Sequence, residues 1–156
     1  MNTRATCQWC QDEITHADDV AATNTEIVHK RCAANQKGMA HVVAVYGTLK
    51  RGFGNHRVIA PGQFLGTDTT PGFVMHSLGG FPGVVRGDGT IHIEVYAVDD
   101  QTMGSLDCLE GYRASDPLRG FYDRVQIDTR FGRAWLYVYN GSLVGRPRVR
   151  GGNYGH

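Results

Sequence analysis

Three cysteines and one histidine near the N-terminus have the spacing of zinc ligands. Cys7 and Cys10 form one pair, His29 and Cys32 form a second, and the full pattern is C-x2-C-x18-H-x2-C. Each pair can offer two ligands to one tetrahedral ion, and thiolate and imidazole are ligand types that suit zinc. A redox C-x-x-C motif would need no His-x2-Cys partner, and a stable disulfide is not expected without a secretory signal. The pattern therefore predicts one structural zinc ion.

The predicted zinc module covers residues 1–38 and resembles a treble-clef or LIM-like finger. A segment of this size is too small to build a sufficient core and usually needs a metal. Zinc would supply folding free energy on the order of 10 kcal/mol. Four protein ligands leave no open coordination position, so the ion is expected to take no part in chemistry.

The residues between the ligand pairs support this interpretation. A short strand is expected at Glu26–Val28, after a turn at Asp18–Asp19 or at Asn24. Trp9 and Lys30–Arg31 could contact a protein or nucleic-acid partner. The alternative is that these side chains pack on the module and solubilise it.

A glutamate at the end of a predicted helix is the candidate for proton transfer. Met103, Leu106 and Glu110 stand at positions i, i+3 and i+7, so Glu110 continues the apolar stripe of a helix expected over residues 101–109. Burial and the carbonyl end of the helix would both raise its pKa. A raised pKa suits a carboxylate that accepts and returns a proton near neutral pH. A frayed, exposed glutamate at a helix end is the alternative.

A glycine-rich loop offers a place for an anion. Residues 42–45 form an apolar run that is typical of a buried strand, and Gly47, Gly52 and Gly54 follow within eight residues. Glycine lets backbone N–H groups approach a ligand closely. The loop is therefore expected to bind a substrate carboxylate.

Strands punctuated by glycine, proline or aspartate are expected to position these residues. Besides the apolar run, strands are predicted at 62–69, 72–77, 90–98, 121–129 and 133–140. The one main helix has Asp99 or Asp100 as its N-cap and ends at Gly111. The prediction is an α+β domain at residues 39–140, built as a small mixed β-barrel and joined to the zinc module at Gly38.

Two segments resemble a known enzyme family. Residues 46–52, Tyr-Gly-Thr-Leu-Lys-Arg-Gly, followed by Asn-His-Arg at 55–57, resemble the signature loop of the γ-glutamylcyclotransferase-like (AIG2-like) family, most closely its γ-glutamylamine cyclotransferase branch. Residues 106–112, Leu-Asp-Cys-Leu-Glu-Gly-Tyr, are similar to the segment that carries the family's essential glutamate. The resemblance implies a compact α+β barrel of the γ-glutamylcyclotransferase type with a cavity at one end, and no cofactor for catalysis.

The resemblance also implies an intramolecular aminolysis of a small-molecule γ-glutamyl amide. The α-amine attacks the γ-carbonyl of the same molecule, which closes 5-oxoproline and expels an amine, with Glu110 as general acid and base. Because both reacting groups belong to one molecule, the enzyme mainly holds the folded conformer and moves protons. The residues implied in substrate binding are Tyr46, Gly47, Thr48, Leu49 and Tyr122. The three in the loop would act through their N–H groups, and Tyr122 through its hydroxyl.

Three neighbouring groups receive no part in this chemistry. Glu94 shares a strand face with His92 and Tyr96 and is interpreted as structural. Asp107 points away from the apolar stripe and is expected to be solvated or bonded to neighbouring backbone. Cys108 is expected to be a small buried hydrophobe.

The choice of substrate stays open. Leu109-Glu110-Gly111 stands where the γ-glutamylamine branch often has Phe-Glu-Ser, so γ-glutamylamines, γ-glutamyl amino acids and another amide are all candidates. The added zinc module suggests recruitment to a protein or nucleic-acid partner. A second hypothesis is therefore a catalytically idle barrel that serves as a binding module for such a partner.

Composition and charge exclude further classes of function. With 16 basic and 15 acidic residues, the chain has no overall field that would gather nucleic acid or an anionic membrane. No apolar stretch approaches 18 residues, so a soluble, cytoplasmic protein without membrane contact is expected. The tail at 141–156 holds three arginines among glycine and proline and is expected to be flexible.

Overall fold

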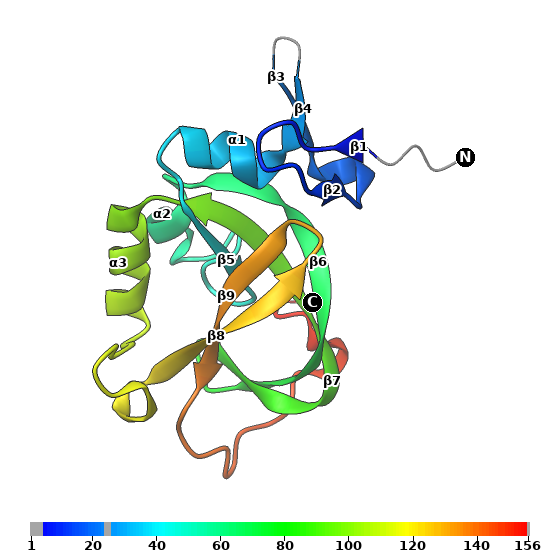
Figure 1. Cartoon of the computed structure of the whole chain (residues 1–156). Helices are drawn as coiled ribbons and strands as arrows, with labels where there is room; N and C mark the ends of the chain where they lie inside the picture. Colours follow the sequence, from blue (N-terminus) through cyan, green and yellow to red (C-terminus); the bar gives the residue numbers. More distant parts are fainter. Residues whose placement is uncertain (1–4, 24–25, 156) are drawn as a thin grey trace.

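The computed structural model describes residues 5–23 and 26–155. Its main part is a five-stranded sheet in the order β6-β7-β5-β9-β8 (Figure 1). The strands are β5 (His41–Val45), β6 (Gln63–Ser77), β7 (Pro82–Val98), β8 (Tyr122–Thr129) and β9 (Gly132–Tyr139). The helices are α1 (Lys30–Gln36), α2 (His56–Ile59) and α3 (Asp100–Leu109), with short 3-10 turns η1 (Ala17–Asp19), η2 (Pro117–Arg119) and η3 (Arg150–Gly152). β5 and β9 run parallel, and the other neighbouring strands run antiparallel.

One main sheet with few helices confirms the predicted α+β class. The predicted barrel is wrong, because the sheet curls without closing. β6 and β8 form its two edges. They approach each other at the turn between β8 and β9, where the Arg130 N–H donates to Asp68 on β6 over 3.0 Å. The fully buried ring of Phe131 fills the remaining gap, and a Cβ atom on Gly66 would lie 2.3 Å from that ring. Side-chain packing thus takes the place of strand pairing at this seam.

The β6–β7 hairpin is longer than the sequence predicted. The two strands expected at 62–69 and 72–77 form the single strand β6, and β7 begins at Pro82 and not at residue 90. The register shift between Pro71 and Phe73 lies where the break was expected, and a second shift lies between Phe64 and Gly66. Such bulges bend a strand and let the ladder continue, so the hairpin can wrap around the core.

β5 crosses the middle of the sheet and is buried on both faces. Ala44 and Tyr46 pack in the core enclosed by the curled sheet. Val43 and Val45 face a second core that includes residues of α2 and α3. Burial on both faces explains why this stretch reads as a continuous apolar run.

The boundaries of α3 agree with the sequence prediction. Asp99 is its N-cap, and the carboxylate accepts a hydrogen bond from the Thr102 N–H over 2.7 Å. The helix ends at Leu109, and Gly111 adopts a positive φ of 64° two residues later. Glu110 is the residue between helix and turn, which fixes where its side chain points.

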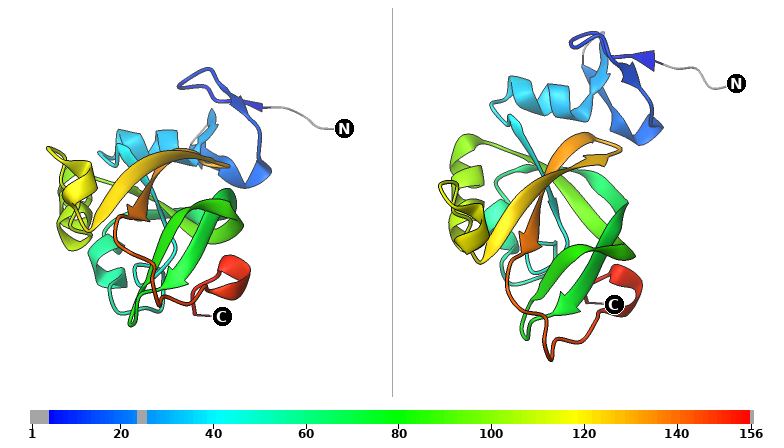
Figure 2. Two further views of the ribbon diagram at one scale, coloured as in Figure 1. Left: turned by 90° about the horizontal axis from the view of Figure 1, so that it is seen from below. Right: turned by 60° about the horizontal axis from the view of Figure 1, so that its bottom comes forward.

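The N-terminal module packs on one end of the sheet (Figures 1 and 2). It contains two small antiparallel pairs, β1 (Ala5–Thr6) with β2 (Glu13–Ile14) and β3 (Val20–Thr23) with β4 (Glu26–His29), followed by α1. Asp18 and Asp19 lie in η1, whereas the turn proposed at Asn24 lies outside the described residues.

The module is joined to the sheet by more than its linker. Ala34 of α1 is fully buried in the core of the curled sheet. The Lys30 ammonium donates to the Leu65 carbonyl over 3.0 Å, and the Arg130 guanidinium pairs with Asp18 over 2.7 Å. Module and sheet therefore share a core and an ion pair.

The C-terminal segment packs along β6, which differs from the expected flexible tail. The Val149 N–H donates to the Met75 carbonyl, and the Ser77 N–H donates to the Pro147 carbonyl, each over 2.8 Å. We call residues 146–155 the C-terminal strap. The expectation rested on composition, which does not reveal backbone hydrogen bonds to a strand edge.

Within residues 5–23 and 26–155, no helix has the length and apolar character needed to cross a bilayer.

Candidate active site and metal site

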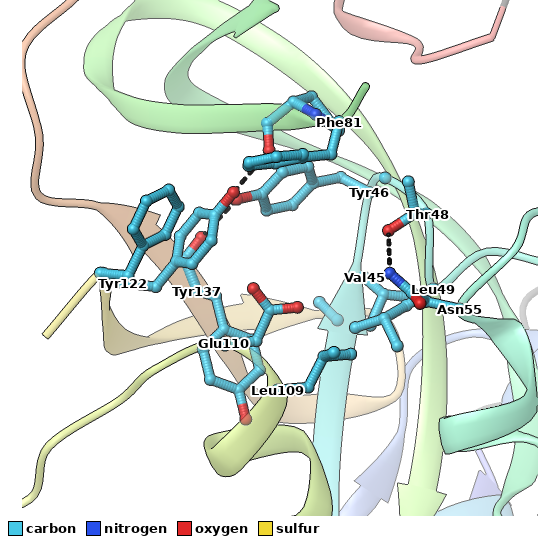
Figure 3. A pocket seen from close by; sticks show the side chains of 14 residues that line it. Val45, Tyr46, Thr48, Leu49, Asn55, Phe81, Leu109, Glu110, Tyr122 and Tyr137 are labelled. Atoms are coloured by element: carbon cyan, nitrogen blue, oxygen red, sulfur yellow. Dashed lines mark hydrogen bonds between the residues drawn. The ribbon is translucent and has the colours of Figure 1, made fainter. Parts of the chain in front are cut away.

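A cavity of about 240 Å³ opens between the loop after β5 and the end of α3 (Figure 3). The sequence predicted six residues for substrate binding and proton transfer, and the structure brings all six to the wall of this cavity: Tyr46, Gly47, Thr48, Leu49, Glu110 and Tyr122. They come from segments more than sixty residues apart in the chain, and the curled sheet places them together.

Glu110 directs its carboxylate into the cavity (Figure 3). Its backbone is held because its carbonyl accepts from the Tyr122 N–H over 3.2 Å and its N–H donates to the Leu106 carbonyl over 2.9 Å. Burial raises the pKa of the carboxyl group to about 7. In the described part of the chain, no group donates a hydrogen bond to this carboxylate. It is therefore free to exchange a proton with a bound molecule near neutral pH.

The two predicted tyrosines already use their hydroxyl hydrogens. The Tyr46 hydroxyl donates to the Tyr137 carbonyl over 2.8 Å, and the Tyr122 hydroxyl donates to the Pro82 carbonyl over 2.7 Å. Burial, and further the charge of Glu110, raise the pKa of both tyrosines. Both hydroxyls therefore stay neutral, and in the cavity wall their oxygens are left only as hydrogen-bond acceptors.

The loop after β5 presents unused backbone donors. Across residues 5–23 and 26–155, no protein acceptor bonds the N–H groups of Gly47, Thr48 or Leu49. Asn55 braces the loop, because its side-chain amide donates to the Thr48 hydroxyl and its N–H to the Thr48 carbonyl, each over 3.0 Å. A Cβ atom on Gly47 would lie 2.7 Å from the Pro82 ring, so this position needs glycine. Successive free N–H groups of this kind form a concavity that suits an anion.

Asp107 is half-buried and bonded to side chains of β8 and β9, which corrects the expectation of a solvated or backbone-bonded carboxylate. Its carboxylate accepts from Arg124 on β8 over 2.9 Å and from the Tyr137 hydroxyl on β9 over 2.8 Å. The Arg124 guanidinium also lies 4.5 Å from the ring centre of Trp135. Helix periodicity could not show that a long arginine from β8 reaches this side of α3. These contacts fix the helix turn that carries Glu110.

Glu94 has the structural contacts that the sequence predicted, whereas Cys108 does not have the predicted burial. The Glu94 carboxylate accepts from the Arg51 N–H over 3.0 Å and from the Tyr96 hydroxyl over 2.8 Å, so it braces the loop and β7. Cys108 is exposed and not buried. It lies outside the apolar stripe of α3, which the sequence prediction overlooked.

The four predicted metal ligands lie together in the N-terminal module. The ligand atoms of Cys7, Cys10, His29 and Cys32 are all within 4.8 Å of one another. The His29 Nδ1 atom is 3.5 Å from the Cys10 sulfur and 3.9 Å from the Cys32 sulfur. In a tetrahedral zinc site, Zn–S and Zn–N distances of about 2.3 and 2.0–2.1 Å place such atoms roughly 3.6 Å apart. The cluster can therefore bind a metal ion with little rearrangement.

The surroundings of the cluster also suit a metal. The His29 Nε2 atom lies 3.2 Å from the Glu13 carbonyl, so its proton can be donated there and Nδ1 is left as ligand. Burial alone would raise the pKa of the Cys7 thiol. Hydrogen bonds from the backbone N–H groups of Cys10, His29 and Trp9 have the larger opposite effect and lower the pKa to about 6. Burial and the neighbouring thiols raise the pKa of Cys32 to about 12. One cation in this space would balance several thiolates at once.

This combination of a curled sheet, an unpaired carboxylate and free N–H groups defines a site for acyl or proton transfer on a small anionic molecule. The family model described as "Gamma-glutamyl cyclotransferase, AIG2-like" matches residues 43–156. The chain therefore belongs to the gamma-glutamyl cyclotransferase, AIG2-like family, and it is an enzyme of that class. The match begins after the cysteine and histidine cluster, so the family model does not cover the N-terminal module.

Individual relatives agree with this assignment. A gamma-glutamylcyclotransferase-type protein of Vibrio cholerae is 42% identical over 102 residues, which cover 65% of this chain and 84% of the relative. The gamma-glutamylcyclotransferase family protein YtfP of Escherichia coli is 36% identical over 112 residues, covering 72% of this chain and 94% of YtfP.

Solved structures show the same fold. The solution structure of Escherichia coli YtfP has a TM-score of 0.58 at 36% identity and covers 72% of this chain and 95% of that one. The crystal structure of an uncharacterized protein of Pyrococcus horikoshii has a TM-score of 0.60 at 28% identity and covers 73% of this chain and 89% of that one.

Proposed function

We propose that this protein is a cyclotransferase that converts a γ-glutamyl amide into 5-oxoproline and a free amine. The single observation that carries the proposal is the unpaired carboxylate of Glu110, whose pKa lies near 7, in a cavity walled by free N–H groups. A hydrolase would have to activate a water, whereas ring closure needs only proton movement within one folded substrate.

The proposed reaction starts with the α-carboxylate of the substrate on the N–H groups of Gly47, Thr48 and Leu49. Glu110 takes a proton from the α-ammonium, and the free amine attacks the γ-carbonyl carbon. The tetrahedral intermediate then collapses as Glu110 returns this proton to the leaving nitrogen. The ring nitrogen gives up its second extra proton to the expelled amine, which departs as an ammonium ion, so the lactam nitrogen keeps one hydrogen. The C–N bond to the amine breaks, the ring C–N bond is retained, and the carboxylate is restored. No metal or cofactor is assigned to these steps.

The decisive experiment measures 5-oxoproline release from γ-glutamyl-ε-lysine and a panel of γ-glutamyl amides. Glu110→Gln should lose activity while its circular dichroism spectrum stays unchanged. Asp128→Asn is the matched control, because this carboxylate on β8 is 89% exposed. Retained turnover in Glu110→Gln would rule out the mechanism. The alternative of an idle barrel would gain support if the intact protein turned over none of the substrates.

For the N-terminal module we propose a structural zinc ion bound by Cys7, Cys10, His29 and Cys32. Support comes from the donor set and its spacing. The ion would hold the two small strand pairs and the start of α1 in place, at a site with no open position for chemistry. Native mass spectrometry should find one zinc ion per chain.

A macromolecular partner for this module has less support. The Trp9 indole N–H donates to the Glu26 carboxylate, and Lys30 is bound to the Leu65 carbonyl. Arg31 lies 3.8 Å from Asp12. The side chains proposed for partner contact are therefore engaged within the chain, which favours a bracing role.

A further inference from the structure

The mouth of the cavity is lined by large apolar side chains that are exposed. Phe81, Leu109 and Phe121 are 37%, 43% and 48% exposed, and all three line the same cavity as Glu110. Figure 3 shows Phe81 and Leu109 on opposite sides of the space into which the Glu110 carboxylate points. Exposed apolar surface next to a reactive group is typical of a binding surface and costs solvation when left bare.

Phe121 of this rim is held by contacts with neighbouring rings and backbone. The Phe121 ring lies 5.9 Å from the ring centre of Phe81 and 5.3 Å from that of Tyr139. The Phe121 backbone is fixed at both of its polar groups, since its N–H donates to the Gly111 carbonyl and its carbonyl accepts from the Asn140 N–H. A preformed aromatic surface binds an apolar group with little ordering cost.

The described cavity lining has no cation that could pair with a carboxylate on the leaving amine. Among its lining residues in the described part of the chain, Glu110 is the one side chain that carries a charge near neutral pH. Two nearby cations are engaged elsewhere, because Arg124 is paired with Asp107 and Arg51 stacks on Phe64 at 3.9 Å. A leaving group with a carboxylate would meet the charge of Glu110 and no partner. A leaving group with an ammonium would lose water of hydration against the apolar side chains at the cavity mouth. Glu110 would be its one ionic partner in the described lining, and Glu110 loses its charge when it takes up the proton of the substrate.

We infer that the preferred substrates are γ-glutamyl amides whose leaving amine carries an uncharged apolar or aromatic group. That group packs against Phe81, Leu109 and Phe121 while the γ-glutamyl half occupies the inner cavity. This specificity rests on the proposed cyclotransferase function and adds the class of the expelled amine. γ-Glutamyl amino acids and γ-glutamyl-ε-lysine are poorer substrates on this account.

Three conjugates of matched length test the inference. γ-Glutamyl-n-hexylamide ends in a methyl group, γ-glutamylcadaverine in an ammonium, and γ-glutamyl-6-aminohexanoate in a carboxylate. The kcat/KM for 5-oxoproline release should be highest for the hexylamide, by about tenfold or more over each charged conjugate, as pocket discrimination of this kind allows. Equal or faster turnover of either charged conjugate would overturn the inference but leave the cyclotransferase proposal intact. No 5-oxoproline from any of the three, nor from γ-glutamyl-ε-lysine, would overturn both.

Variants of the rim give a second test. Phe121→Ala and Phe81→Ala should each reduce the hexylamide preference about tenfold, and Phe121→Arg should reduce it further by favouring the 6-aminohexanoate conjugate. Leu118→Ala is the matched control, because Leu118 is 80% exposed and lies outside the cavity lining. Because Phe121 also packs on Tyr122, its variants could fail to fold. Phe81→Ala then still tests the inference. An unchanged preference in folded Phe81→Ala would contradict the inference.

Discussion

The ammonium group of Lys50 donates a hydrogen bond to the carbonyl oxygen of Tyr154 over 2.9 Å, and this bond ties the C-terminal strap to the loop after β5. The same ammonium donates to the Asn153 side chain over 3.0 Å, and Lys50 is buried. The rings of Phe53 and Tyr154 lie 5.5 Å apart and add a second contact. The strap therefore helps to hold the loop whose free N–H groups face Glu110.

Lys50→Met should raise KM for a γ-glutamyl amide about tenfold, with a smaller effect on kcat. The variant loses two hydrogen bonds of a charged donor, each of which contributes on the order of 1.5–3 kcal/mol. The loop that we propose to bind the substrate carboxylate should then become less ordered. Lys37→Met, at an exposed position after α1, is the control. Steady-state kinetics on both variants would separate the two effects, and an unchanged KM would show that the strap does not order the loop.

The pH dependence of kcat/KM should report the ionisation of Glu110. Burial places its pKa at about 7, and the reaction needs the ionised form to accept a proton. The rate should rise about tenfold per pH unit below roughly pH 6 and level off above roughly pH 8, as expected for a general base in the free enzyme. A midpoint near the ordinary glutamate value would mean that the carboxylate is well solvated.

Glu110→Gln should make the fold more stable at alkaline pH. The folded pKa of about 7 is above the ordinary value of 4.5, so the folded state binds more protons than the unfolded state between these values. The stability of the natural protein then falls as pH rises through 7, whereas the amide does not ionise. The free energy of unfolding of the variant, relative to that of the natural protein, should increase by about 1–3 kcal/mol when the pH is raised from 5 to 8.5. Urea titrations at both pH values would measure the difference, and no change with pH would contradict the burial argument.

Loss of the metal ligands should destabilise the whole chain. Ala34 of α1 lies in the core of the sheet, so unfolding of the module would expose that core. Cys32→Ser, or removal of metal with a chelator, should lower Tm by at least about 5 °C, which corresponds to a loss of one or more kcal/mol. Cys108→Ser is the matched control, because Cys108 is an exposed cysteine outside the cluster. Equal Tm values for the two variants would argue against a structural metal.

Local sequence patterns predicted which residues line the candidate site. Contacts between residues far apart in the chain determined how those residues are held. The position of Glu110 follows from helix periodicity and from the turn at Gly111, both of which depend on neighbouring residues. The Asp107–Arg124 pair and the strap on β6 join residues far apart in the chain, and composition or periodicity carries no information on such pairs. The closed barrel failed for the same reason. Whether β6 and β8 pair depends on Phe131 filling the gap between them.

The strap has a consequence for how copies of this protein meet one another. β6 is an edge strand, and its backbone groups at Met75 and Ser77 would be open to a strand from another molecule if the strap did not occupy them. Exposed edges of this kind are templates for edge-to-edge aggregation. By bonding to both positions, the C-terminal strap covers this part of the β6 edge, so the segment that contacts the loop after β5 also leaves fewer backbone groups open to a strand from a second molecule.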